Sequence, residues 1–232
     1  MNYNPNEFDR SYPVPETLGQ YTAKTFLWMV LGLMITFGVA IAAWLSGIVF
    51  LAFQGRIVIL IVTLVLAITM SGRIEKMSVG GAKAMFLTYS ALLGLTMSVY
   101  LLVFNFASLV LVFFATAIYF GALAAYGYLT KRDLSGYRSI LISGLIFLIV
   151  FALLSWLIPG LTVMDRVVCL IGIAIFLGYT AYDTQQIKNY YYYYAGYPDM
   201  LEKASIFSAL HLYLDFINLF LYLLRFLGNR RD

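Results

Sequence analysis

Two aspartates, Asp183 and Asp215, lie inside long apolar stretches, whereas the other acidic residues fall in the N-terminal tail, in loops or at helix ends. A charged side chain at the centre of a membrane costs about 2.5–3.5 kcal/mol on insertion scales. An apolar residue at either position would avoid that cost, so a carboxylate there indicates a function. The two aspartates are therefore the first candidates for the chemistry of this chain.

Two carboxylates that lie side by side in apolar surroundings cannot both ionise cheaply, because their charges repel and water is excluded. Such a pair shares a proton and titrates as a unit, which suits a proton sensor. When both groups ionise, their oxygens suit a hard cation such as calcium. We therefore predict that Asp183 and Asp215 form a pH sensor and a cation-binding, metal-ligating pair.

Polar residues recur along the last apolar segment at spacings of three and four, which places them on one face of a helix. This stripe comprises Ser208, His211, Asp215, Asn218, Tyr222 and Arg225. A second stripe on the preceding segment comprises Tyr179, Asp183, Gln186 and Tyr190. Such stripes face a bundle interior or a water-filled path. The commoner role of Asn218 and Tyr222 is hydrogen bonding between packed helices, and His211 is interpreted as a core imidazole.

The relative depth of the two aspartates depends on where the sixth apolar segment ends. Asp215 lies twelve residues past Lys203, about 18 Å along a helix, whereas Asp183 lies five residues before Lys188, about 7.5 Å. If the sixth helix continues through Tyr190–Tyr194, Asp183 lies about 16 Å from its end, and the acids become level. We take this option, in which the tyrosines form an aromatic belt.

The composition is that of a membrane protein. Hydrophobic residues make up 62% of the 232-residue chain and charged residues 11%, against about 25% charged in soluble domains. Long apolar runs between charged breaks give seven segments, near 25–46, 57–71, 82–103, 106–129, 139–158, 166–188 and 204–227. The sequence thus predicts an all-α polytopic membrane protein, with a polar tail at 1–24 and one seven-helix membrane domain at 25–228.

Lysine and arginine mark the cytoplasmic loops of membrane proteins. They concentrate in the tail and in every second loop, whereas the intervening loops hold only Arg56 and Arg166. We therefore predict a multi-pass protein of the cell membrane with a cytoplasmic N-terminus and tail. The net charge of +4 reflects those loops, so the expected partner is the lipid bilayer and not a nucleic acid.

The seventh segment is followed by Arg225, Arg230 and Arg231, which would lie outside if the segment spans the membrane. A re-entrant segment would keep them inside, as the charge rule prefers. Its roughly 24 residues make about 36 Å of helix, enough to cross, and we favour spanning. Because its polar stripe needs shelter from lipid, we predict that this helix is central and surrounded by the other six.

Arg73 ends the second segment on the side where the sixth segment also ends. A guanidinium at that place is able to reach Asp183 and to hold a closed state as a latch. The alternative is that Arg73 only contributes to the ordinary positive charge of a cytoplasmic loop.

Three stretches, GYTAYDTQQIKNY, LYLDFINLFLYLLRF and GAKAMFLTYSALLGLTMS, resemble the Bax-inhibitor family, the transmembrane Bax-inhibitor-motif proteins. The resemblance covers essentially the whole membrane domain, and the sequence looks like a bacterial member. It implies seven helices, with the last at the centre of two three-helix layers. It also implies a pH-sensitive calcium leak channel, with calcium as the permeant ion.

The resemblance also implies roles for individual residues. In the family an aspartate of the sixth helix and one of the seventh form the sensor pair, and these match Asp183 and Asp215. An arginine at the end of the second helix acts as a latch and best matches Arg73. The chain departs from the family in two respects: IVILIVTLVLAITM lacks a glutamate that some members carry, and the tyrosine-rich loop lengthens the spacing between the aspartates.

The residues leave other function classes to weigh. An intramembrane aspartyl protease needs Gly-x-Gly-Asp on the last segment, but Leu212 and Leu214 replace the glycines, so a substrate backbone cannot approach closely and no enzyme is expected. The main alternative to a channel is a non-conducting subunit that modulates a membrane protease or another membrane protein. A proton-coupled transporter is disfavoured because paired interrupted helices are missing. With Cys169 alone, no cysteine metal cluster forms, and no cofactor is expected.

Overall fold

The computed structural model describes residues 16–73, 76–158 and 160–229. This part of the chain is helical and holds no β-strand. Its helices are α1 (Leu18–Leu45), α2 (Val49–Gln54), α3 (Arg56–Arg73), α4 (Val79–Ser98), α5 (Tyr100–Val103), α6 (Phe106–Leu129), α7 (Arg138–Leu157), α8 (Asp165–Tyr193) and α9 (Pro198–Leu227). Short 3-10 turns at Ser135–Tyr137 and Leu161–Met164 precede α7 and α8.

The long helices coincide with the seven predicted apolar segments. Six stretches are long and apolar enough to cross a membrane: α1, α4 with α5, α6, most of α7, α8 and α9. The remaining predicted segment, the second along the chain, corresponds to Arg56–Met70 within α3. It is apolar but shorter, because the helix is interrupted at Gly55 between α2 and α3. The predicted all-α polytopic membrane fold is confirmed.

Helix α1 begins seven residues earlier than the predicted segment at 25. Thr17 and Gln20 form a capping box, in which the Thr17 hydroxyl accepts from the Gln20 amide and the Gln20 side chain accepts from the Thr17 amide (2.9 Å). This reciprocal cap satisfies two amides that a helix start leaves unpaired, so the helix extends into polar sequence. Most of the predicted tail, residues 1–15, lies outside the described residues.

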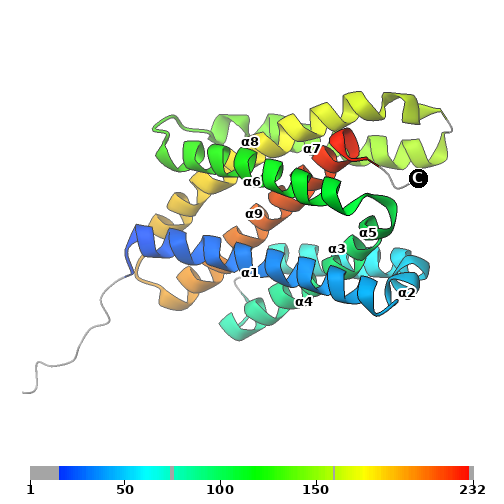
Figure 1. Ribbon diagram of the computed structural model, residues 1–232. Helices are drawn as coiled ribbons and strands as arrows, with labels where there is room; N and C mark the ends of the chain where they lie inside the picture. The colour runs from blue at the N-terminus through cyan, green and yellow to red at the C-terminus, as the bar shows by residue number, and fades with distance from the viewer. Residues whose placement is uncertain (1–15, 74–75, 159, 230–232) are drawn as a thin grey trace, which may run out of the picture.

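Helix α9 occupies the centre of the bundle. Figure 1 shows α6, α7 and α8 in one layer and α1, α3 and α4 in another, with α9 crossing between the layers. Helix α9 packs against α8, α1, α6 and α4, and Ala209, Leu212 and Leu219 on it are fully buried. The predicted central position of the last helix is confirmed.

Lysines gather where α1, α4 and α9 begin and where α6 and α8 end, which we call the basic end of the bundle. Their partners link these elements through Lys24–Glu16 (2.8 Å), Lys83–Glu202, Lys188 with the Tyr128 carbonyl (2.7 Å) and Lys203 with the Met77 carbonyl (3.2 Å). The Tyr191 hydroxyl on α8 also donates to the Glu16 carbonyl (2.7 Å). The loops that carry most cations therefore lie on one side of the bundle.

Helix α9 runs from the basic end to the opposite end. Its first turns meet the loop before α4 through Lys203. Just past its last turn, the Asn229 amide donates to the Ser108 hydroxyl (3.3 Å) and the Asn105 amide donates to the Asn229 carbonyl (3.1 Å), both at the start of α6. The helix thus has the spanning course favoured by its length, and the re-entrant alternative is wrong.

Small and polar residues fix how closely the helices approach. Gly127 on α6 lies against the backbone carbonyl of Ala181 on α8, where any Cβ would clash. The hydroxyls of Thr36 on α1 and Tyr213 on α9 lie 2.6 Å apart in the core. Close backbone approach and buried polar pairs stabilise helix packing where apolar burial cannot, and here they fix α6 against α8 and α1 against α9.

Candidate functional site

Asp183 on α8 and Asp215 on α9 face each other in the bundle. Their side chains are almost completely buried, with relative exposures of 9% and 4%. The two carboxyl groups line the same cavity, and the Oδ2 atom of Asp215 is buried without a hydrogen-bond partner among the described residues. A hydrogen bond between two carboxyl groups needs a proton on one of them, so the geometry suits a shared proton.

The two acids meet because α8 is long. It continues to Tyr193, with Tyr194 as its C-cap, so the option of a helix that extends through the tyrosines is confirmed. The rings of Tyr190 and Tyr194 stack at 6.4 Å. Asp183 therefore lies about 15 Å from the end of α8, deep enough to reach the level of Asp215.

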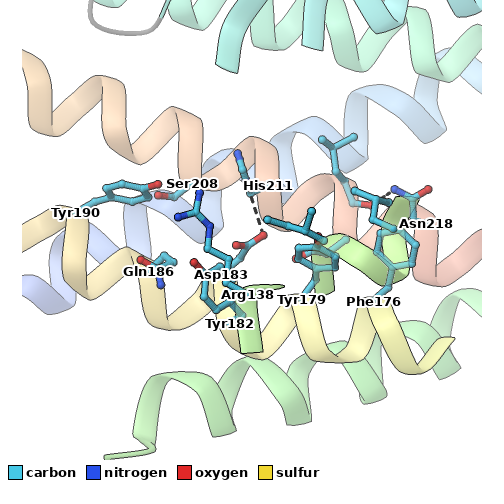
Figure 2. A pocket seen from close by; sticks show the side chains of 14 residues that line it. Arg138, Phe176, Tyr179, Tyr182, Asp183, Gln186, Tyr190, Ser208, His211 and Asn218 are labelled. Atoms are coloured by element: carbon cyan, nitrogen blue, oxygen red, sulfur yellow. Dashed lines mark hydrogen bonds and ion pairs between the residues drawn. The ribbon is translucent and has the colours of Figure 1, made fainter. Parts of the chain in front are cut away.

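A cavity of about 430 Å³ opens between α7, α8 and α9 beside the acids (Figure 2). Its polar lining comprises Arg138, Tyr179, Tyr182, Asp183, Gln186, Tyr190, Ser208, His211, Asp215 and Asn218. Ile142, Leu145, Phe176 and Leu214 complete the wall. We call it the carboxylate cavity. It brings together both acids and six other residues of the predicted stripes, namely Tyr179, Gln186, Tyr190, Ser208, His211 and Asn218.

His211 contacts the acid pair directly. Its Nδ1 atom lies 3.4 Å from Oδ2 of Asp183, and 38% of its side chain is exposed. The Phe207 ring packs on the imidazole with centroids 4.4 Å apart. The interpretation of His211 as a core imidazole is therefore wrong, because the histidine lies on the wall of the carboxylate cavity and is only partly buried.

Tyr222 and Arg225, the last two stripe residues of α9, lie away from the carboxylate cavity, whereas Asn218 lines it. Tyr222 stacks on Phe176 at 5.8 Å and covers Gly172 on α8, so it packs the two helices and is not among the residues that line the carboxylate cavity. The Asn218 amide donates to the Leu214 carbonyl of its own helix (2.8 Å). Arg225 pairs with Asp165 at the opposite end of the bundle (3.4 Å).

Arg138 is a cavity residue that sequence reasoning assigned only to a positive loop. It is the first residue of α7, and Figure 2 draws it among the side chains around Asp183. Gln185 on α8 fixes the preceding loop, because its side chain accepts from the Leu134 amide and donates to the Arg132 carbonyl, both at 2.8 Å. The spacing of Arg138, Ile142 and Leu145 marks one face of α7 in the sequence, but only the fold shows that this face lines the cavity.

The predicted latch is placed only in part. Arg73 is the last residue of α3, but its side chain lies outside the described residues. Helix α3 packs on α4 and α2, whereas Asp183 belongs to the other layer. The latch role of Arg73 therefore stays a prediction, and Arg138 is a cation that the structure does place beside the acid pair.

The acid pair offers few ligands to a metal ion. Across the described ranges, no three His, Cys, Asp or Glu side chains come together in a way that would hold a metal. Calcium takes six to eight oxygen ligands in proteins, and two carboxyl groups supply at most four. The arrangement therefore suits brief contact with a passing cation better than a resident metal.

Comparisons with known proteins give a consistent result. The sequence pattern of the family described as "Inhibitor of apoptosis-promoting Bax1" matches residues 18–232. The chain is 42% identical to "Inner membrane protein YbhL" of Escherichia coli K12 over 224 residues, which is 92% of this chain and 93% of that protein. It is 39% identical over 221 residues to a protein of Rickettsia prowazekii, covering 94% and 92% of the two chains. A membrane protein of Streptococcus pyogenes is 32% identical over 224 residues, which is 91% and 93% of the two chains.

Proposed function

This chain belongs to the Bax-inhibitor family of multi-pass membrane proteins, and on that premise we propose that it is a pH-sensitive calcium leak channel gated by Asp183 and Asp215. One observation carries the proposal. The two carboxyl groups lie buried together on the wall of a cavity inside a membrane bundle. Buried acids are retained in membranes where ions or protons need them.

The pair supports gating through its proton. At low pH one proton shared by the two carboxyl groups leaves the pair with a single negative charge, so Arg138 is held more weakly than by the fully ionised pair. At high pH both carboxyl groups ionise, and the pair attracts the guanidinium of Arg138 on α7. Because the cavity lies between α7, α8 and α9, that attraction draws α7 inward and closes the path. Leak is therefore expected to rise as the pH falls.

The proposal places the basic end of the bundle in the cytoplasm of a cell-membrane protein. The lysines at that end follow the charge rule for cytoplasmic loops, and α1 also begins there. Calcium is the proposed permeant ion because paired carboxylate oxygens suit a hard cation. The small number of ligands allows the ion to leave again, which conduction requires.

The pair of acids on adjacent helices also resembles the arrangement of an aspartyl protease, and the structure supplies a reason to prefer a non-enzymatic role. Leu214 lines the carboxylate cavity next to Asp215, where such a protease has glycine. Its side chain occupies the space that a substrate backbone would need. Leu212 is fully buried in the core, so the local backbone of α9 is an ordinary packed helix.

Calcium flux into liposomes that contain the purified chain tests the proposal. We expect a leak that rises at low pH in the wild type and a pH-independent leak in a variant with both Asp183→Asn and Asp215→Asn. Asp133→Asn is the matched control, because hydrogen bonds from the Ser135 hydroxyl and amide hold the pKa of this loop acid below its usual range. A folded wild type without flux at any pH would contradict the channel and favour a non-conducting modulator that binds a membrane protease or another protein.

A further inference from the structure

A second cavity, of about 540 Å³, lies near the opposite end of the bundle between α3, α4–α5 and α9. Two arginines line it, Arg56 from the start of α3 and Arg225 from the last turn of α9. We call it the arginine cavity. These cations lie at the end of the bundle where the sequence places few lysines and arginines, yet both face one space.

Arg56 has no carboxylate partner among the described residues. Its Nη1 atom donates to the Phe53 carbonyl (3.0 Å), and its guanidinium lies over the Phe53 ring at 4.6 Å. Both contacts are to the turn that immediately precedes it. Since a guanidinium carries five N–H donors, most of its donors remain available to a ligand in the cavity.

Arg225 is only loosely neutralised. Its Nη2 atom lies 3.4 Å from Oδ1 of Asp165, and 42% of its side chain is exposed. Charge-assisted N–H···O bonds are typically about 2.7–2.9 Å, so this ion pair is long. With one carboxylate for two guanidinium groups, the cavity keeps a net positive charge.

The walls of the arginine cavity are mostly apolar. Ala52, Ile57, Leu60, Val99, Val103 and Phe104 contribute to them, together with Thr96 and Tyr100. Ile57 and Leu60 are each 62% exposed on the outer face of α3, where a membrane helix meets lipid tails. A ligand that suits this site is anionic at one end and apolar along its body.

From these contacts we propose that the arginine cavity binds one anionic phospholipid, with its phosphate between Arg56 and Arg225 and an acyl chain along α3. Guanidinium groups bind phosphate oxygens in pairs, and basic pockets between membrane helices bind lipid headgroups. The site also accounts for two cations at the end of the bundle that holds few of them, namely Arg56 at the start of α3 and Arg225 in the last turn of α9. The proposal does not depend on ion conduction.

Lipid binding to the full chain in detergent micelles, measured by native mass spectrometry, tests the proposal. The probes are phosphatidylglycerol, phosphatidylcholine and inorganic phosphate. We expect the wild type to prefer phosphatidylglycerol, Arg56→Gln and Arg225→Gln each to weaken its binding about tenfold, as loss of a charge-assisted contact does, and the double variant to lose the preference over phosphatidylcholine. Arg166→Gln, which removes an exposed arginine of the same end that is not in this cavity, should bind like the wild type.

Three results would overturn the site. Equal binding by the wild type and the double variant would show that the arginines are not ligands. An equal loss in Arg166→Gln would show general surface attraction without a site. Competition by inorganic phosphate as effective as that by the lipid would show that the apolar walls hold no acyl chain. If Arg225→Gln misfolds because Asp165 is left unpaired, Arg56→Gln, whose contacts are confined to its own turn, carries the test.

Discussion

The carboxylate cavity and the arginine cavity are both lined by α9, but they hold their charges in opposite ways. The acids are buried and line one cavity together. The arginines are exposed and are held by an aromatic ring, a carbonyl and one long ion pair. The charge of the acid pair therefore depends on protons and on neighbouring cations of the protein. The arginines are only partly neutralised by the protein, so they are able to bind an anion from outside the chain.

One helix serves both cavities because its polar stripe is long enough to reach both ends of the bundle. Asp215 and Arg225 are ten residues apart, which is about 2.8 turns of an α-helix. Arg225 therefore points about 80° away from the direction of Asp215. The stripe faces α7 and α8 as far as Asn218, and its last residue lines the cavity beside α3 and α5. A polar stripe in a long helix thus need not serve a single site.

The largest loss of stability is expected from a change at the contact between Gly127 on α6 and the Ala181 backbone on α8. A Cβ on Gly127 would clash with the Ala181 backbone, and such overpacking typically costs about 1–3 kcal/mol. Gly127→Ala should lower the thermal unfolding midpoint and abolish the pH response of the leak, while selective lipid binding at the distant arginine cavity persists. Gly121→Ala is the control, because its Cβ would meet no neighbouring atom. Equal unfolding midpoints for the two variants would show that the close approach is unimportant.

The next largest effect is a change in the pH dependence of the leak, which should differ between substitutions of Asp183 and Asp215. Asp215→Asn removes the charge that repels Asp183, so Asp183 should ionise at lower pH and the leak transition should move down by about one pH unit. Asp183→Asn should imitate the protonated state and leave the leak high across the pH range. Leak in liposomes measured against pH distinguishes these outcomes. If both variants keep the wild-type midpoint, the aspartates are structural polar groups.

A smaller effect on the leak is expected from a substitution of Arg138, the arginine that lines the carboxylate cavity. Arg138→Gln removes the charge that ionised acids attract, so leak at high pH should rise, at most about fivefold, since an exposed charge contact contributes up to about 1 kcal/mol. Arg132→Gln removes an exposed arginine of the adjoining loop that is not part of the cavity lining and should change nothing. A loss of flux in folded Arg138→Gln would instead assign Arg138 to the conduction path.

The smallest effect is a change in lipid affinity at the arginine cavity. Asp165→Asn removes the carboxylate that competes for Arg225, so phosphatidylglycerol should bind about threefold more tightly, within the 0.2–1 kcal/mol of an exposed ion pair. The gain should vanish when Arg225→Gln is added. Weaker binding in Asp165→Asn would show that the ion pair positions Arg225 for the lipid and does not compete with it.

The sequence predicted the fold well because membrane helices are long apolar runs. The seven segments and the central last helix follow from hydropathy and from the shelter that Asp215 needs. The start of α1 was missed, although TLGQ at 17–20 is a recognisable capping box. The break at Gly55 was not expected, because it depends on how α2 and α3 pack on α4.

The candidate site was predicted in part. Helical spacing identified Asp183 and Asp215 and six other residues of the cavity lining, since spacing defines a face. It did not identify Arg138, because only the fold shows that the start of α7 lies beside Asp183. Likewise, the spacing along one helix does not show that Tyr222 packs on Phe176 or that Arg225 pairs with Asp165. Both contacts depend on the position of the neighbouring helix α8.

The central claim, that Asp183 and Asp215 share a proton, is tested most directly by infrared difference spectroscopy of the protein in liposomes during a pH titration. The account predicts a protonated carboxyl band in the wild type that disappears with the same midpoint as the calcium leak and is missing from the double variant with Asp183→Asn and Asp215→Asn. A wild type without that band, or a band whose midpoint differs from that of the leak, would contradict the claim.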